Sequence, residues 1–319
     1  MSEPILTARG VVQTFASAAP GGGGRGIVRA VDGVDLDVHE GETLGIVGES
    51  GSGKSTLARL LLSLAQPNAG TIAYRGTPIP ALSRPQRRVY RRDVQAVFQD
   101  PAASLNPRMP VERILAHVIL RHGLATRATL HGVIAAHLES VGLSPAASFM
   151  TRYPHQLSGG QQQRVAVARA MVLRPRLIIA DEPLSSLDIS VQTQLLAVMT
   201  ELQQRTGVGF VIISHDLGAV ESIADRVAVM YRGRIVESGP RVLAEPRHAY
   251  TKALLEAKLI PDPHLATLRG DIAENDTIGD LRRPAPGNEP VAPTVARQDA
   301  FSPHERNRRC DSTRSAMAP

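Results

Sequence analysis

One nine-residue segment, Gly48–Thr56, restricts the possible folds of this chain more than any other part. Its sequence is Gly-Glu-Ser-Gly-Ser-Gly-Lys-Ser-Thr, and it joins the apolar run Thr43–Val47, a predicted buried strand, to the helical pattern Ser55–Leu64. A glycine-rich turn in this context lets consecutive N–H groups face an anion, and the helix N-terminus adds partial positive charge. The segment therefore predicts a phosphate site in an α/β fold; a glycine-rich turn that binds no nucleotide is the alternative.

The residue types in this loop indicate what each would contact. Lys54 is expected to reach the β- and γ-phosphates of a nucleotide, and the hydroxyl of Ser55 is expected to hold Mg²⁺. The curled backbone should also bring the other loop residues to the nucleotide, namely Gly48, Glu49, Ser50, Gly51, Ser52, Gly53 and Thr56. A nucleotide with β- and γ-phosphates and Mg²⁺ are therefore the ligands that this loop predicts.

Two acidic residues follow a second predicted strand. This strand, Leu177–Ala180, is apolar throughout and leads into Asp181 and Glu182. Because parallel strands end at the same edge of a sheet, these carboxylates are expected beside the phosphate loop. Asp181 suits Mg²⁺ bound through water, and Glu182 suits a general base for an attacking water molecule. Alone, such a pattern more often marks a strand that ends in a turn; the phosphate loop favours the catalytic interpretation.

A third motif carries a resemblance to a known family. Leu157–Gln161, with the sequence Leu-Ser-Gly-Gly-Gln, resembles the signature motif of the ABC ATPases, and a helix is predicted after it. Serine and two glycines at a helix start form another anion site. In that family the motif binds the γ-phosphate that the opposite subunit holds, so ATP is buried between two subunits. The resemblance implies an ATP-hydrolysing enzyme with nucleotide contacts at Ser158, Gly159, Gly160 and Gln161.

Four further residues occur in the order that the family implies. Gln99 matches the Q-loop residue that senses Mg²⁺ and water, and His215 matches the switch histidine that contacts the γ-phosphate. Asp188 matches the D-loop, although the family usually has alanine where Ser186 stands. Phe15 matches the aromatic residue that stacks on adenine, and it could equally belong to the core. The implied catalytic residues are Glu182, His215 and Gln99, and the implied metal ligands are Ser55, Gln99 and Asp181.

The resemblance covers roughly residues 5–260 and implies a P-loop NTPase fold of the α/β class. Its parts are a RecA-like core sheet, a small antiparallel β-subdomain and an inserted helical subdomain at about residues 100–173. The residue pattern agrees, because segments 5–15 and 27–38 alternate as half-exposed strands and the stretch 100–173 is helical with breaks. Later strands alternate with helices, which predicts a largely parallel sheet with helices on both faces.

Four segments narrow the resemblance to the oligopeptide, dipeptide and nickel importer branch: Phe98–Arg108, Arg152–His155, His248–Leu255 and Ile260–Pro263. The branch implies an ATPase subunit that energises the import of peptides or related solutes. Two such subunits, identical or homologous, act beneath two transmembrane permeases, which receive the solute from a binding protein. The chain would then be a peripheral protein on the cytoplasmic face of the inner membrane.

The C-terminal part of the chain, residues 261–319, departs from that branch. Relatives often carry several cysteines there, in some cases around an iron–sulphur cluster, whereas this chain has Cys310 alone. One thiolate does not hold a cluster that requires four ligands, so we expect none. Proline and arginine are frequent in this tail and its hydrophobic periodicity is weak, so little fixed structure is expected.

Composition and charge limit the remaining possibilities. The apolar stretches are far shorter than the roughly 18 residues of a membrane span, and the N-terminus has no secretory pattern, so we expect a cytosolic chain that docks onto others. The net charge of +6 fits a nucleic-acid or anionic-membrane partner, but a solvated helix at Arg84–Arg92 and a solvated tail also explain it. The alternative functions are an exporter ATPase, or one acting with nucleic acid or ribosomes. The chain has a single cassette and neither zinc nor coiled-coil modules, so we expect no nucleic-acid partner.

Overall fold

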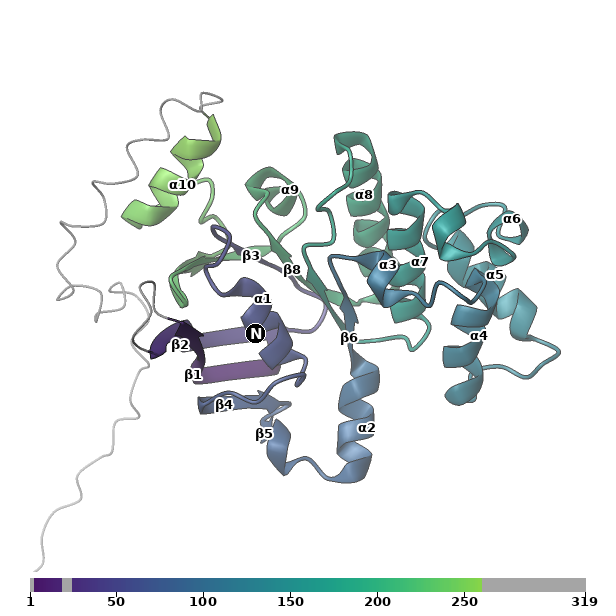
Figure 1. The fold of residues 1–319 in the computed structure, drawn as a ribbon, viewed down its shortest axis with the longest axis horizontal. Coiled ribbons are helices and arrows are strands. Elements are labelled where there is room, and N and C mark those ends of the chain that lie inside the picture. The colour runs from purple at the N-terminus through teal and green to yellow at the C-terminus, as the bar shows by residue number, and fades with distance from the viewer. Residues whose placement is uncertain (1–2, 19–24, 260–319) are drawn as a thin grey trace, which may run out of the picture. The chain divides into compact units, whose positions relative to one another are not determined.

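The computed structural model describes residues 3–18 and 25–259 of the chain (Figure 1). The described residues all belong to one compact unit, Met1–Pro261. The glycine run 21–24 and the predicted tail at 261–319 lie outside the described residues. None of the described helices is both long and apolar enough to cross a membrane.

A six-stranded sheet forms the core of this unit, in the order β10–β9–β3–β8–β7–β6. Its strands are β3 (Thr43–Val47), β6 (Val94–Val97), β7 (Leu177–Asp181), β8 (Gly209–Ser214), β9 (Arg226–Tyr231) and β10 (Arg234–Gly239). The strands from β9 to β6 run parallel, and β10 pairs antiparallel with β9. The largely parallel sheet predicted from the sequence is therefore confirmed.

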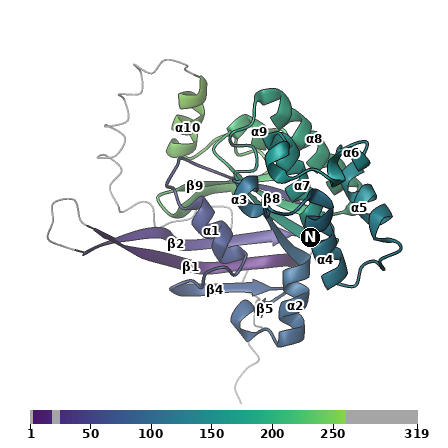
Figure 2. The same cartoon turned by 45° about the vertical axis from the view of Figure 1, so that its right-hand side comes forward.

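A second, four-stranded antiparallel sheet holds the N-terminal part of the chain, in the order β2–β1–β4–β5. Its strands are β1 (Pro4–Ala18), β2 (Arg25–His39), β4 (Ala69–Tyr74) and β5 (Thr77–Pro78). The two long strands β1 and β2 pair from end to end, and β4 lies beside β1 (Figure 2). This sheet corresponds to the predicted antiparallel β-subdomain.

The six-stranded sheet buries its two faces against different layers. In β7, Leu177 and Ile179 pack with α1 (Lys54–Leu61) and the antiparallel sheet, whereas Ile178 and Ala180 pack with helices on the opposite face. Those helices include α7 (Gly159–Met171), α8 (Ile189–Thr206) and α9 (Leu217–Glu221). Helices are thus present on both faces as expected, but the antiparallel sheet shares the first face with α1, which the strand pattern did not indicate.

Between β6 and β7 the chain is helical. This stretch holds α3 (Pro101–Ser104), α4 (Val111–Arg121), α5 (Leu130–Glu139), α6 (Ala147–Met150) and α7, with a short 3₁₀ turn at Pro154–Gln156. Buried aliphatic side chains, among them Leu115, Ile134 and Leu138, join these helices to α7 and α8. Figure 1 shows the group α4–α6 away from β1 and β2. The predicted helical pattern is confirmed, and the domain limits given for it stay a prediction.

Three other helices differ from or extend the sequence-based assignment. The first helix, expected over Ser55–Leu64, ends at Leu61, and Ser63 then adopts a left-handed backbone with φ of 53°. The basic helix is confirmed as α2 (Arg84–Asp93). Helix α10 (Ala249–Leu259) was not predicted, because its apolar residues do not gather on one face and its periodic pattern is weak.

Candidate functional site

The phosphate loop leaves β3 and enters α1, as the sequence predicts. Gly53 precedes the helix with a left-handed backbone at φ of 107°, and Gly48 has φ of 151°. A Cβ atom on Gly48 would lie 2.1 Å from the carbonyl oxygen of Met230, and one on Gly53 would lie 1.9 Å from that of Ala30. Both positions therefore require glycine, because the loop packs directly on the backbone of β9 and β2.

Lys54, the first residue of α1, points back into the loop. Its Nζ atom donates hydrogen bonds to the carbonyl oxygens of Gly48 and Glu49, both at 2.7 Å, and the side chain is buried. Burial lowers the pKa of Lys54, while the carboxylates of Glu182 and Asp181 oppose this shift. The ammonium group is therefore fixed inside the loop by two backbone carbonyls.

The next residue, Ser55, joins the loop to the end of β7. Its hydroxyl donates a hydrogen bond of 2.9 Å to Oδ1 of Asp181. Asp181 is only 8% exposed, and burial raises the pKa of its carboxyl, an effect that the bond from Ser55 opposes. The structure therefore brings this carboxylate beside the loop, as the parallel-strand argument predicts.

Glu182 and His215 meet at the same edge of the sheet. Glu182 follows β7 with a left-handed backbone at φ of 51°, and its N–H donates to the carbonyl oxygen of Ile213 in β8 at 2.9 Å. Nδ1 of His215, just after β8, lies 2.7 Å from Oε2 of Glu182. The Glu182 side chain is 14% exposed and that of His215 is 63% exposed, so the pair extends from the sheet edge to the protein surface.

Gln99 and Phe15 are both exposed. Gln99 lies beyond the end of β6, the strand that pairs with β7. Phe15 lies on β1 with 50% of its surface exposed, so the alternative that places it in the core is wrong. Their expected contacts with water, Mg²⁺ and adenine stay predictions.

The predicted signature segment forms the N-terminus of α7. Ser158 is the N-cap: its hydroxyl accepts from the N–H of Gln161, and the Gln161 side chain accepts from the N–H of Ser158, which makes a capping box. A Cβ atom on Gly160 would lie 2.3 Å from Cγ1 of Val191, so α7 and α8 approach each other closely here. Ser158 and Gly159 are exposed, and their described hydrogen bonds do not involve the phosphate loop of the same chain.

Asp188, the predicted D-loop residue, is the N-cap of α8. Its carboxylate accepts hydrogen bonds from the hydroxyl of Ser190 at 2.7 Å and from the N–H of Val191 at 2.9 Å. These bonds, chiefly the one from Ser190, lower the pKa of Asp188. This capping role was not predicted from the sequence, although an aspartate before a helical run is a typical N-cap signal.

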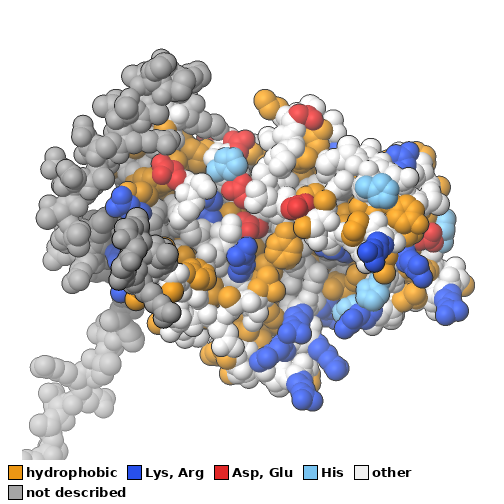
Figure 3. Space-filling view, viewed as in Figure 1, with side chains coloured by type: hydrophobic (Ala, Val, Ile, Leu, Met, Phe, Trp, Pro, Cys, Tyr) orange, Lys and Arg blue, Asp and Glu red, His pale blue; other side chains and the backbone are white. Residues whose placement is uncertain are grey.

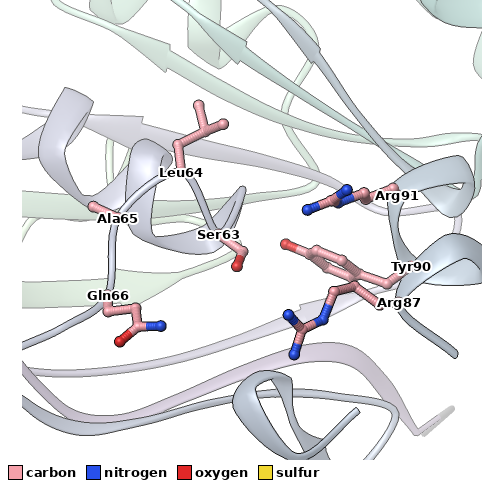
Figure 4. A pocket seen from close by; sticks show the side chains of 7 residues that line it. All are labelled: Ser63, Leu64, Ala65, Gln66, Arg87, Tyr90 and Arg91. Atoms are coloured by element: carbon pink, nitrogen blue, oxygen red, sulfur yellow. The ribbon is translucent and has the colours of Figure 1, made fainter. Parts of the chain in front are cut away.

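A separate cleft of about 270 Å³ lies between the end of α1 and α2 (Figure 4). It is lined by Ser63, Leu64, Ala65, Gln66, Arg87, Tyr90 and Arg91. Helix α2 buries Tyr90 and Asp93 and exposes its arginines, which gather on the face shown in Figure 3. This arrangement fits the solvated helix expected for the basic segment, and the cleft contains none of the predicted site residues.

Comparisons with known proteins identify the family. The model of the family described as ABC transporter matches residues 31–185. The putative oligopeptide transport ATP-binding protein YkfD of Bacillus subtilis is 48% identical over 267 residues, which span 82% of this chain and 79% of the relative. The chain belongs to the ABC transporter family. The oligopeptide transport ATP-binding protein OppF of Escherichia coli is a further ABC relative, 44% identical over 270 residues, which span 82% of this chain and 78% of OppF.

A solved structure agrees with the ABC assignment. The dimeric ATP-binding cassette MJ0796, in a post-hydrolysis state bound to ADP and phosphate, matches with a TM-score of 0.64 at 27% identity. The match covers 74% of this chain and 98% of MJ0796. The predicted P-loop NTPase fold of the α/β class is therefore confirmed, and the protein is an ABC ATPase, which binds and hydrolyses ATP.

Proposed function

We propose that this ABC ATPase energises the import of peptides or related solutes, of the dipeptide, oligopeptide or nickel type. One observation carries the chemical part of the proposal: the bonded pairs Ser55–Asp181 and Glu182–His215 stand side by side at the sheet edge next to the phosphate loop. The transport part is supported by the relatives at 48% and 44% identity, both of which are named as oligopeptide transport ATP-binding proteins.

In this proposal the loop Gly48–Thr56 binds the phosphates of ATP. The N-terminus of α1 provides N–H groups that no earlier helical turn uses, together with a partial positive charge. Lys54 adds a full charge, already fixed inside the loop by two carbonyl oxygens. Phe15, exposed on β1, is the proposed stacking partner of the adenine ring.

The donor set at this edge fits Mg²⁺, which prefers oxygen ligands. The hydroxyl of Ser55 and the carboxylate of Asp181 are 2.9 Å apart, and Gln99 offers an amide oxygen after the neighbouring strand β6. We assign the metal site to these three residues, with Asp181 acting through water. When bound, Mg²⁺ supplies charge that offsets that of the phosphates.

Glu182 is the proposed general base. Its carboxylate would orient the attacking water, together with Gln99 beyond the neighbouring strand β6, and would accept the proton as water attacks the γ-phosphate. The bond to His215 at 2.7 Å holds this carboxylate in place within a single chain. A second ATPase subunit would complete the site with residues of its helix N-termini: Ser158, Gly159, Gly160, Gln161 and Asp188.

The proposed assembly contains two ATPase subunits, identical or homologous, and two membrane permeases, with a solute-binding protein acting indirectly and no nucleic acid. We place the chain on the cytoplasmic face of the inner membrane as a peripheral protein. Residues 5–260 would form the ATPase domain, 100–173 its helical part and 261–319 the tail. Gln99 leads into that helical part. Closure of the two subunits around ATP would therefore move the helical part, and this movement would act on the permease.

Glu182→Gln in the full chain tests the chemistry. We expect ATP hydrolysis to fall by about 10²–10⁴-fold, the usual contribution of a general base, while ATP still binds. With ATP and Mg²⁺ the variant should accumulate as a closed pair of chains in size-exclusion chromatography. Glu221→Gln, at an exposed glutamate of α9, is the matched control and should hydrolyse ATP normally. Unchanged hydrolysis in Glu182→Gln would refute the assignment of the base.

Purification of the tagged protein from native membranes in mild detergent tests the transport role. Mass spectrometry should identify two multi-span permeases, with or without a second ATPase. Ribosomal or nucleic-acid-processing chains without a permease would overturn the import proposal and favour the alternative function, while leaving the ATPase chemistry unaffected.

A further inference from the structure

Helix α10, the last one described, reaches the phosphate loop through one side chain. The hydroxyl of Tyr250 accepts a hydrogen bond from the N–H of Glu49 at 3.2 Å, although the two residues are 201 positions apart. The sequence pattern places Tyr250 in a segment typical of the importer branch and gives it no role. Because Glu49 is the second residue of the loop, this bond joins α10 to the nucleotide site.

The hydrogen bond from Glu49 to Tyr250 fixes one side of the peptide unit between Gly48 and Glu49, and the other side of this unit binds Lys54. The N–H of Glu49 and the carbonyl of Gly48 belong to the same trans peptide, so they point in opposite directions. That carbonyl accepts a hydrogen bond from Nζ of Lys54 at 2.7 Å. Tyr250 therefore fixes the orientation of the peptide plane on which the ammonium of Lys54 rests.

The ring of Tyr250 is itself held by β9. It packs on the ring of Tyr231, with the centroids 4.1 Å and the planes 31° apart. Tyr231 ends β9, the strand that pairs directly with β3, and β3 leads into the phosphate loop. Both partners of the bond between Tyr250 and Glu49 are thus anchored on the same pair of strands.

Hydrogen bonds also anchor the start of α10. The carboxylate of Glu237, in β10, accepts from the N–H groups of Arg247 at 2.9 Å and His248 at 3.1 Å. Nδ1 of His248 in turn accepts from the N–H of Tyr250 at 3.1 Å. Tyr250 and Leu254 pack against the core of the unit. The backbone and the ring of Tyr250 are therefore both fixed, as a positioning role requires.

We propose that Tyr250 is a positioning residue for Lys54, and that through it α10 sets the affinity of the loop for ATP. The inference rests on the proposed function of this loop as the ATP site. Burial raises the pKa of the Tyr250 hydroxyl, so the group stays neutral at physiological pH and its oxygen accepts as a phenol. Without that oxygen, the peptide between Gly48 and Glu49 is free to tilt, and Lys54 loses a fixed acceptor.

Tyr250→Phe in the full chain tests the proposal, because phenylalanine keeps the ring and its packing and removes only the hydroxyl. We expect the Kd and KM for ATP to rise about three- to tenfold, the effect of one hydrogen bond, with kcat at saturating ATP unchanged. The N–H of Glu49 should also exchange faster with deuterium in the nucleotide-free protein, since it loses its acceptor.

Tyr74→Phe is the matched control. The Tyr74 hydroxyl donates a buried bond of 2.8 Å to Asp93, in a region that does not touch the loop, so its loss should lower stability and leave the KM unchanged. Wild-type KM and wild-type exchange at Glu49 in Tyr250→Phe would overturn the proposal. Equal KM shifts in both variants would also overturn it, because they indicate general loosening. If the wild-type protein itself fails to bind ATP, the proposed function fails, and this inference fails with it.

Discussion

Lys54 lies between two sets of oxygen atoms. Two backbone carbonyls accept its hydrogen bonds, and the carboxylates of Glu182, Asp181 and Glu49 oppose the effect of burial on its pKa. A buried ammonium is costly unless it is paired, so these carboxylates help to keep the charge inside the loop before any nucleotide arrives. The acidic end of β7 therefore has a role in the free protein as well as in the proposed reaction.

Lys54→Ala should weaken ATP binding about 10- to 100-fold, because a charge-assisted hydrogen bond to phosphate is lost. Isothermal titration calorimetry with ATP measures this change. Lys252→Ala, at an exposed lysine of α10, removes the same chemical group elsewhere and should bind ATP normally. Normal ATP affinity in Lys54→Ala would contradict the assignment of the loop.

The individual residues of the site differ in how far the sequence could predict them. Asp181 beside Ser55 followed from strand direction alone, because parallel strands end at one edge. His215 was identified only through the family resemblance, since a lone histidine after a strand has no distinctive pattern, and its contact with Glu182 was not predicted. The contact of Tyr250 with Glu49 could not be predicted, because no local pattern specifies a hydrogen bond across 201 positions.

At the scale of elements, the contact between α7 and α8 depends on a glycine, Gly160, which has no side chain. Gly160 is buried in the first turn of α7, and a Cβ there would meet Cγ1 of Val191 at 2.3 Å. Valine is stiff at χ1, so it does not easily turn away. The signature segment and the first turn of α8 are therefore held together by close packing.

Gly160→Ala should destabilise the fold by about 1–3 kcal/mol, the usual cost of overpacking. In a Val191→Ala background most of that cost should disappear, because the clashing methyl group is gone. Urea unfolding of the wild type, both single variants and the double variant measures this coupling. Strictly additive effects would show that the two helices adjust independently of this contact.

Whole strands and helices were predicted best where apolar residues repeat in a clear pattern. The parallel strands are continuous apolar runs, and both β1 and β2 alternate, so their positions emerged from the sequence. The end of α1 at Leu61 was not predicted, because it is set by the left-handed backbone at Ser63 rather than by the apolar pattern. Helix α10 was missed because it is held by contacts of Glu237 and Tyr250 rather than marked by an apolar stripe.

At the scale of the whole unit, Asp32 links the two sheets. It lies on β2 of the antiparallel sheet, and its Oδ2 accepts hydrogen bonds from Arg234 on β10 of the six-stranded sheet at 2.9 and 2.6 Å. Arg29 adds a bond of 2.9 Å from within β2. These guanidinium groups hold the pKa of Asp32 below its ordinary value of 3.8, and the hydrogen bond from Arg234 has the largest effect. The ionised carboxylate is therefore the form that stabilises the junction.

Asp32→Asn should lower stability at pH 7 by about 1 kcal/mol or less, because both arginines are half-exposed and water weakens the ion pair. The stabilisation is present above pH 3.8 and is lost as the pH falls through the lower folded-state pKa of Asp32. The difference between wild type and variant should therefore close in acid. Denaturant unfolding at a series of pH values measures it; a difference that persists in strong acid would mean that charge is not its source.

Glu182 stands in a backbone conformation that suits glycine. With φ of 51°, a residue that carries a Cβ is held there at a cost on the order of 1 kcal/mol. Its N–H is bonded to Ile213, and its carbonyl accepts from Ser185, so the neighbouring chain enforces the conformation. Selection for thermal stability alone would favour glycine at this position, and the more stable variant would lack the proposed general base. Thermal stability and catalytic turnover thus place opposite demands on this one residue.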